Sequence, residues 1–99
     1  MKLLWTPEGK ADRRAIYAYI EPDDRRAALE LDEQFERRAT QLVAHPMIGR
    51  LGRVRDTREL VVSPNYLLVY DIRGNTIRIL RVLHTARQWP PKPHSSDHA

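Results

Sequence analysis

Residues 57–90 read TRELVVSPNYLLVYDIRGNTIRILRVLHTARQWP, and this stretch decides the fold. Three apolar runs are separated by two turn signals, Ser63-Pro64-Asn65 and Arg73-Gly74-Asn75. Runs rich in Val, Ile, Leu and Tyr that are interrupted by Pro, Gly and Asn are typical of an antiparallel meander. The stretch therefore predicts three consecutive antiparallel strands. The first two cover residues 58–62 and 66–72, and the third begins near Ile77.

Details within this stretch refine the prediction. Residues 66–72 are almost wholly apolar, as expected for a central strand covered on both faces. Gly74 and Asn75 tolerate the positive φ that a tight hairpin requires. The alternation of apolar and polar residues shifts at residues 80–83, which indicates a β-bulge in the last strand.

The N-terminal half predicts a strand followed by two helices. Residues 2–6 form a short apolar stretch, and Thr6-Pro7-Glu8 is a typical helix start. This helix should end near residues 20–21, because Pro22 disfavours helical geometry in the residue before it. A second, longer helix is expected from residues 22–24 until His45-Pro46. The predicted fold is therefore α+β: an N-terminal strand, a two-helix hairpin and a three-stranded antiparallel meander, with the helices packed on one face of the sheet.

The remaining segments are predicted to be loops. Residues 47–56 read MIGRLGRVRD, and their two glycines and three arginines predict a flexible, solvated connector. The end of the chain reads PPKPHSSDHA, a composition typical of extended or disordered chain. We expect a single domain over residues 1–90 and a flexible tail over residues 91–99.

Composition limits the classes of function. The chain has no cysteine, which excludes disulfides and thiolate zinc sites, and none of its four histidines lies in a ligand pattern. We therefore expect neither a metal nor a cofactor. The sequence has no apolar run long enough to cross a bilayer and no apolar signal-peptide core, so we expect no membrane partner and a cytoplasmic protein.

Positive charge is concentrated in the second half of the chain. Residues 51–99 contain 8 Lys+Arg against 4 Asp+Glu, and nearly all of the cations are arginines. Arginine offers paired donors to carboxylate or phosphate, so an acidic partner is expected, either a protein segment or a nucleic acid. A generic basic surface that aids solubility is the alternative. The residues predicted to bind a partner are Arg53, Arg55, Arg58, Arg78, Arg81, Arg87 and Trp89.

A polar cluster at the exit of the last strand is the candidate for chemistry. His84 lies three residues from both Arg81 and Arg87. One interpretation makes His84 a general acid or base, with the arginines stabilising a phosphoryl transition state. The other makes it a hydrogen-bonded residue at a strand end. Trp89 could likewise stack on a base or pack against the edge of the core.

Two patterns in the last third of the chain point to a family. Residues 58–70 read RELVVSPNYLLVY, and residues 79–84 and 86–90 read ILRVLH and ARQWP. Together with the predicted order of elements, they resemble the RelE/ParE superfamily of type II toxin–antitoxin toxins. The patterns R-E-x-x-x-x-P-N-Y-x-x-x-Y and V-L-H-x-x-R-x-[WF]-P are similar to the ParE branch in particular.

The resemblance implies one of two activities. RelE-like members cut messenger RNA on the ribosome, using basic residues of the sheet and a C-terminal base, whereas ParE-like members poison DNA gyrase. In RelE-like toxins an arginine follows the first tyrosine of the central strand, but here Leu67 follows Tyr66. Arg87 still matches the second RelE-like arginine. We therefore expect a ParE-like toxin without a hydrolytic centre, with a ribosome-dependent endoribonuclease that uses Arg81, His84 and Arg87 as the alternative.

The resemblance also implies a partner. ParE-like toxins are neutralised by a small ParD-like antitoxin whose disordered C-terminal segment folds on the toxin. The arginine excess fits such a partner if that segment is acidic. We expect a hetero-oligomer with this antitoxin, and DNA gyrase, or alternatively the ribosome and its mRNA, as the target. A nucleic-acid-binding module without toxicity is disfavoured, because aromatic residues make up only 7% of the chain.

Overall fold

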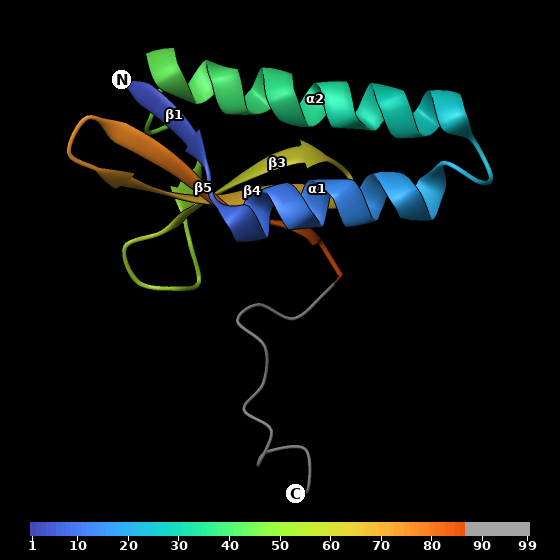
Figure 1. Cartoon of the computed structure of the whole chain (residues 1–99). Coiled ribbons are helices and arrows are strands. Elements are labelled where there is room, and N and C mark those ends of the chain that lie inside the picture. Colours follow the sequence, from blue (N-terminus) through green and yellow to red (C-terminus); the bar gives the residue numbers. More distant parts are fainter. Residues whose placement is uncertain (87–99) are drawn as a thin grey trace, which may run out of the picture.

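A computed structural model of the chain describes residues 1–86 and shows five strands and two helices within them (Figure 1). The strand order in the sheet is β1-β5-β4-β3-β2. β1 runs parallel to β5, and the other neighbours are antiparallel. The elements, in chain order, are β1 (Lys2–Trp5), α1 (Pro7–Ile20), α2 (Arg25–Ala44), β2 (Arg50–Leu51), β3 (Arg58–Ser63), β4 (Tyr66–Arg73) and β5 (Thr76–His84).

Both helices begin where the sequence indicated, α1 at the predicted cap Thr6 and α2 at Asp24, within the predicted start at residues 22–24. The Thr6 hydroxyl accepts a hydrogen bond from the Gly9 N–H at 3.1 Å, with Pro7 at the first helical position of α1. The Asp24 side chain accepts one from the Ala27 N–H at 3.0 Å and so begins α2. The predicted ends before Pro22 and at His45 are confirmed.

The meander is also confirmed, including its irregularity. Gly74 has φ +57° in the turn between β4 and β5, where a residue with a side chain would be strained. Tyr70 pairs with Ile79, and Val69 pairs with Arg81. Leu80 is therefore an extra residue on β5, which is the predicted bulge.

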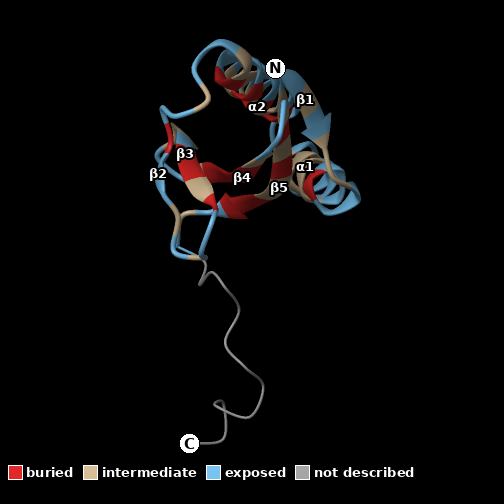
Figure 2. Cartoon of the chain, turned by 90° about the vertical axis from the view of Figure 1, so that its left-hand side faces the viewer, coloured by how far each residue is buried: buried red, intermediate tan, exposed pale blue. Residues whose placement is uncertain are grey.

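The core lies between α2 and the sheet (Figure 2). Phe35, Ala39 and Leu42 of α2 pack with buried residues of the sheet such as Leu68 and Tyr70. Because side chains alternate along a strand, the intervening residues of β4 point to the opposite face. There Leu67 and Val69 form a second buried cluster with Leu83. β4 is therefore buried on both faces, as its apolar sequence predicted.

The structure corrects one prediction and adds one feature. Residues 47–56 are not a flexible connector, because they contain β2 and are bound to the sheet by many hydrogen bonds. The parallel pairing of β1 with β5 joins the two ends of the described chain, a contact that no local pattern encodes. Arg87, Trp89 and the tail lie outside the described residues, so the expected boundary at residue 90 stays a prediction.

Candidate functional site

Arginines of the loop between α2 and β3 are held by one buried acid, Glu59. Its carboxylate accepts hydrogen bonds from the Arg53 backbone N–H and Nε, both at 3.1 Å, and from Arg50 Nη2 at 3.1 Å. Burial by itself raises the pKa of Glu59, but the hydrogen bonds from Arg53 and Arg50 outweigh this effect and hold the pKa below its ordinary value. Glu59 therefore stays ionised and fixes two guanidinium groups on the surface.

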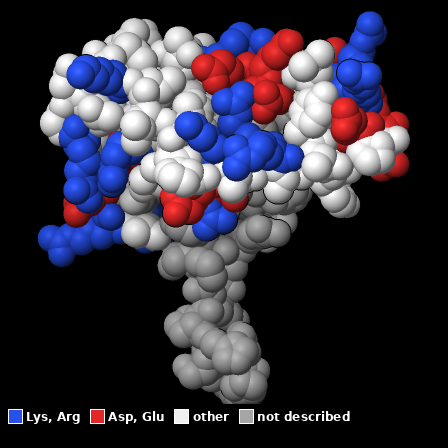
Figure 3. Space-filling model, viewed as in Figure 1, with Lys and Arg blue, Asp and Glu red and all other residues white. Residues whose placement is uncertain are grey.

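A second acid, Asp71, performs the same role at the turn between β4 and β5. Arg78 donates Nε and Nη2 to the two carboxylate oxygens of Asp71, at 2.8 and 2.6 Å. Arg73 lies 3.6 Å from the same carboxylate. Arg58 takes another partner, the Gly49 carbonyl oxygen at 2.7 Å. Basic side chains accordingly gather over this end of the sheet, on the left of Figure 3.

Arg81 is held at a different place. Its Nε and Nη2 donate to the Asp12 carboxylate of α1 at 2.7 and 3.2 Å, and this hydrogen-bonded pair raises the pKa of Arg81. The same carboxylate accepts the Val82 N–H at 2.9 Å. Asp12 therefore joins α1 to the edge of β5.

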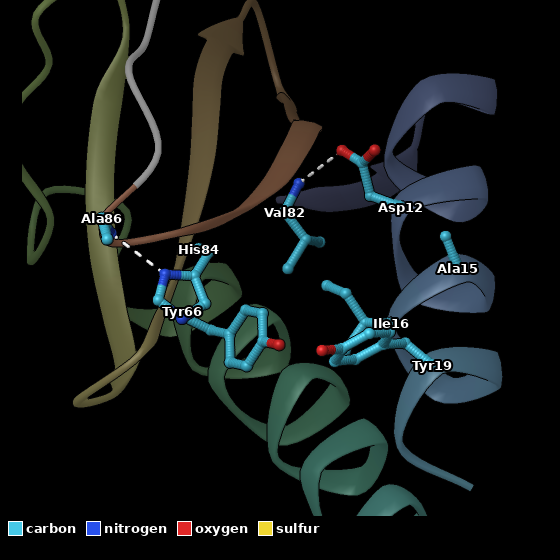
Figure 4. A pocket seen from close by; sticks show the side chains of 8 residues that line it. All are labelled: Asp12, Ala15, Ile16, Tyr19, Tyr66, Val82, His84 and Ala86. Carbon is cyan, nitrogen blue, oxygen red and sulfur yellow. Dashed lines mark hydrogen bonds between the residues drawn. The ribbon is translucent and has the colours of Figure 1, made fainter. Parts of the chain in front are cut away.

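Beside this contact, a groove of about 600 Å³ separates α1 from the end of β5 (Figure 4). Its walls combine small apolar side chains with polar groups of tyrosine, histidine and aspartate, a mixture typical of binding clefts. The lining residues are Asp12, Ala15, Ile16, Tyr19, Tyr66, Val82, His84 and Ala86.

The groove also contains backbone groups of β5 that have no partner within residues 1–86. β1 pairs only with residues 76–79, so the following residues of β5 pair with β4 on one side and have no strand on the other. The Val82 N–H points toward α1, and alternation along a strand makes the Val82 carbonyl and the His84 N–H point the same way. No residue within 1–86 forms a hydrogen bond with these two groups. Such an edge can accept an extended peptide.

His84 lines this groove, and a hydrogen bond and a ring contact fix its orientation. Its Nδ1 accepts a hydrogen bond from the Ala86 N–H at 3.1 Å, and its ring packs edge-on against Tyr66 at 5.2 Å between centroids. A neutral imidazole that accepts at Nδ1 carries its proton on Nε2. With Nδ1 engaged by this hydrogen bond, Nε2 is the ring nitrogen that remains for other contacts.

The predicted site residues fall into three groups. Arg53, Arg55, Arg58 and Arg78 lie around the loop and the β4–β5 turn, at the end of the sheet away from His84. Arg81 and His84 are three residues apart on one strand, so their side chains start from opposite faces. Arg87 and Trp89 lie outside the described residues. The structure thus gives the catalytic interpretation no arginine beside the imidazole within residues 1–86.

Sequence reasoning missed the acids that organise these arginines. Glu59 and Asp71 each directly adjoin a run of apolar residues in a strand, and a charged residue that is buried in a strand is almost always paired. That signal could have identified them. Asp12 carried no such signal, because it lies on an amphipathic helix whose exposed face is full of charges.

Comparison with known proteins decides the family. The family model for the ParE toxin of the type II toxin–antitoxin system parDE matches residues 3–89. The chain belongs to the ParE toxin family. This ParE chain is 36% identical to Y4kP of Sinorhizobium fredii over 90 residues, covering 90% of the chain and 93% of that protein. It is 34% identical to toxin RelE2 of Caulobacter vibrioides over 86 residues, covering 87% and 97%.

Solved structures agree with the family. The ParE chain matches a chain of the chromosomal ParDE toxin–antitoxin system of P. aeruginosa with a TM-score of 0.76 and 27% identity, covering 85% of this chain and 95% of that one. It also shares its fold with the YoeB/ParE toxin of Agrobacterium tumefaciens, with a TM-score of 0.61, 16% identity and coverage of 85% and 98%. Within residues 1–86 of this ParE toxin no helix could cross a membrane, and no group of acids and histidines could hold a metal ion.

Proposed function

We propose that this ParE-family toxin arrests bacterial growth in the cytoplasm by binding a protein target, DNA gyrase, and that a ParD-like antitoxin neutralises it. The observation that carries the proposal is the match to the ParE family across residues 3–89. The geometry of the groove supports it, because His84 Nδ1 accepts the Ala86 N–H and Arg81 is bound to Asp12. The Nδ1 lone pair is thus engaged and is not available to act as a general base.

The groove along β5 is the proposed binding site for the antitoxin. A chain of the P. aeruginosa ParDE toxin–antitoxin system has the same fold. The Val82 carbonyl and the His84 N–H would pair with an extended segment of the antitoxin, while Ile16 and Val82 would contact its apolar side chains. A segment that is disordered before binding can wrap such a cleft.

A ribosome-dependent endoribonuclease is the second candidate, favoured by the 34% identity to toxin RelE2. One experiment separates the two. The chain is expressed alone in bacteria, and plasmid supercoiling and primer extension on a reporter transcript are measured together. We expect cleaved or relaxed plasmid with intact message, and the same growth arrest in His84→Ala. If the message is cut, and the cuts disappear in His84→Ala or Arg87→Ala, gyrase poisoning is rejected in favour of the nuclease. Unimpaired growth would contradict both.

A further inference from the structure

We propose that the loop between α2 and β3 is the surface that docks the protein target, and that it binds an acidic segment carrying apolar side chains. This loop, residues 46–57, is called the arginine loop below. The inference rests on the proposed function and names the surface and the chemistry of the target contact. Four properties of the loop support the inference: its conformation is fixed by hydrogen bonds, it exposes apolar side chains, it is positively charged, and it lies far from the groove.

Hydrogen bonds to the sheet fix the conformation of the arginine loop. The buried Tyr70 hydroxyl accepts a hydrogen bond from the Gly49 N–H at 3.0 Å and donates one to the Pro46 carbonyl at 2.8 Å. The Gly52 N–H donates to the Thr57 carbonyl at 2.8 Å. A Cβ on Gly49 would come within 2.6 Å of the Tyr70 oxygen, so the chain approaches the sheet as closely as glycine allows. Binding to a preorganised loop avoids the entropy cost of ordering it.

The arginine loop presents large apolar side chains to solvent. Leu51 is 78% exposed, Met47 60% and Ile48 47%. Scattered exposed apolar residues are common, but these three lie within five residues of one another on a fixed backbone. Burial of a few such side chains at the centre of an interface supplies much of its binding energy. The loop therefore has apolar anchors already in position.

Arginines surround these anchors and determine the charge of the partner. Glu59 holds Arg50 and Arg53 in place, and both guanidinium groups remain partly exposed. Arg55 is almost fully exposed, at 95% of its side chain. Each guanidinium has five donors, so an arginine already bound to one carboxylate can still bind a second. Acidic side chains of the target would complement this rim.

A protein segment fits the arginine loop better than a nucleic acid. Nucleic-acid affinity comes chiefly from uncompensated cations and, for single strands, from aromatic stacking. Residues 46–57 contain no aromatic residue that could stack on a base. Exposed leucine and methionine side chains, in contrast, are suited to an apolar pocket or helix face.

The arginine loop and the groove lie at opposite edges of the sheet. β2 is the last strand in the order β1-β5-β4-β3-β2, whereas the groove lies where β1 no longer covers β5. The groove also lies at the His84 end of β5, whereas the loop contacts the Tyr70 end of β4. A segment bound in the groove would therefore leave the loop accessible. This separation allows the target and the antitoxin to use different surfaces.

The test uses two substitutions on exposed residues of the loop, Leu51→Glu and Arg55→Glu. Leu29→Glu on α2 is the matched control for the first, because Leu29 is 50% exposed, and Arg37→Glu is the control for the second. Growth inhibition after induction and inhibition of purified bacterial DNA gyrase in a supercoiling assay are measured for each. Thermal melting by circular dichroism verifies that every variant is folded.

We expect each loop variant to lose at least about tenfold in both inhibition assays, as removal of an interface hot spot does, while the controls keep wild-type activity. Folded loop variants with undiminished growth inhibition would overturn the inference while leaving the proposed function intact. If the wild-type chain arrests growth without inhibiting gyrase, gyrase is not the target. The growth assay alone would then test whether the loop binds the target. A duplex DNA probe bound by wild type and lost by both loop variants would replace the protein partner with nucleic acid.

Discussion

Glu59 determines where two arginines of the loop lie, at the cost of burying a carboxylate. It lies on β3 between Arg58 and Leu60, and its side chain is almost fully buried. Such a charge is tolerated only when it is paired and hydrogen-bonded, which Arg50 and Arg53 ensure. The two ion pairs of Glu59 therefore act mainly by positioning the arginines, because the charge of a partly exposed arginine contributes little to the stability of the fold.

Substitution Glu59→Gln should lower the free energy of unfolding by about 2 kcal/mol, because hydrogen bonds to the charged group are lost. Asp56→Asn, at an almost fully exposed position, should change it by less than about 0.5 kcal/mol. Denaturant titration at neutral pH measures both. Equal stability of Glu59→Gln and wild type would show that the buried pair does not hold the loop.

The lowered pKa of Glu59 predicts a dependence of stability on pH. A carboxyl group whose pKa is lower in the folded than in the unfolded chain stabilises the fold at pH values above its unfolded pKa. This contribution disappears as the pH falls from the ordinary value of 4.5 through the lower folded pKa. The free energy of unfolding should therefore decrease less steeply below pH 4.5 in Glu59→Gln than in wild type. Parallel pH profiles of the two proteins would contradict the expectation.

Tyr70 provides a second test of the loop at the residue scale. Tyr70→Phe leaves the Gly49 N–H and the Pro46 carbonyl without their partner, so we expect a loss of about 1–2 kcal/mol in unfolding free energy. Amide hydrogen exchange at Gly49 and Gly52 should also accelerate relative to β4. Tyr19→Phe, at an exposed tyrosine, is the control. Rapid exchange at Gly49 already in wild type would support a flexible loop instead.

At the scale of elements, α1 and its cap bind the part of the β5 edge that β1 does not cover. The Thr6 hydroxyl donates to the Ile79 carbonyl at 2.9 Å, and Asp12 accepts the Val82 N–H. A helix thus satisfies backbone groups that a longer strand would otherwise pair. In the described part of the chain, the Val82 carbonyl and the His84 N–H remain for a partner, and they border the groove.

Asp12→Ala should lower the free energy of unfolding by about 2 kcal/mol, since it removes the acceptor of Arg81 and of the Val82 N–H. Asp12→Asn should lose less, because its amide oxygen can still accept from Val82. Chemical denaturation of both variants measures which of them loses more free energy of unfolding, with Asp23→Asn at an exposed position as the control. An Asn variant as unstable as the Ala variant would mean that the charge alone matters.

At the scale of the whole molecule, two surfaces at opposite edges should act independently. Ala15→Arg would fill the groove with a long cationic side chain, and Ala15 is exposed on a helix that tolerates arginine. We expect Ala15→Arg to keep growth inhibition but to escape neutralisation by a co-expressed ParD-like antitoxin. Colony counts with and without the antitoxin measure this. Full neutralisation of Ala15→Arg would remove the groove from the proposed interface.

The fold was accessible from sequence where the signals are local. Caps at Thr6 and Asp24, the turn at Gly74 and the bulge near Leu80 all depend on neighbouring residues, and each was predicted within a few positions. The candidate site was less accessible. The arginines were recognised as a group, but which acid each one binds depends on strand register and on helix placement.

The sequence by itself determined both helices, the strands β1, β3, β4 and β5, their order and the family, because periodicity, capping and turn chemistry act over a few residues; it missed β2. Only the tertiary structure decided that β1 pairs with β5, that Asp12 reaches Arg81 across 69 positions of the chain, and that the glycine-rich connector becomes a fixed loop on Glu59 and Tyr70. These contacts join distant segments whose pairing is selected by packing of the complete sheet, so no local pattern can specify them.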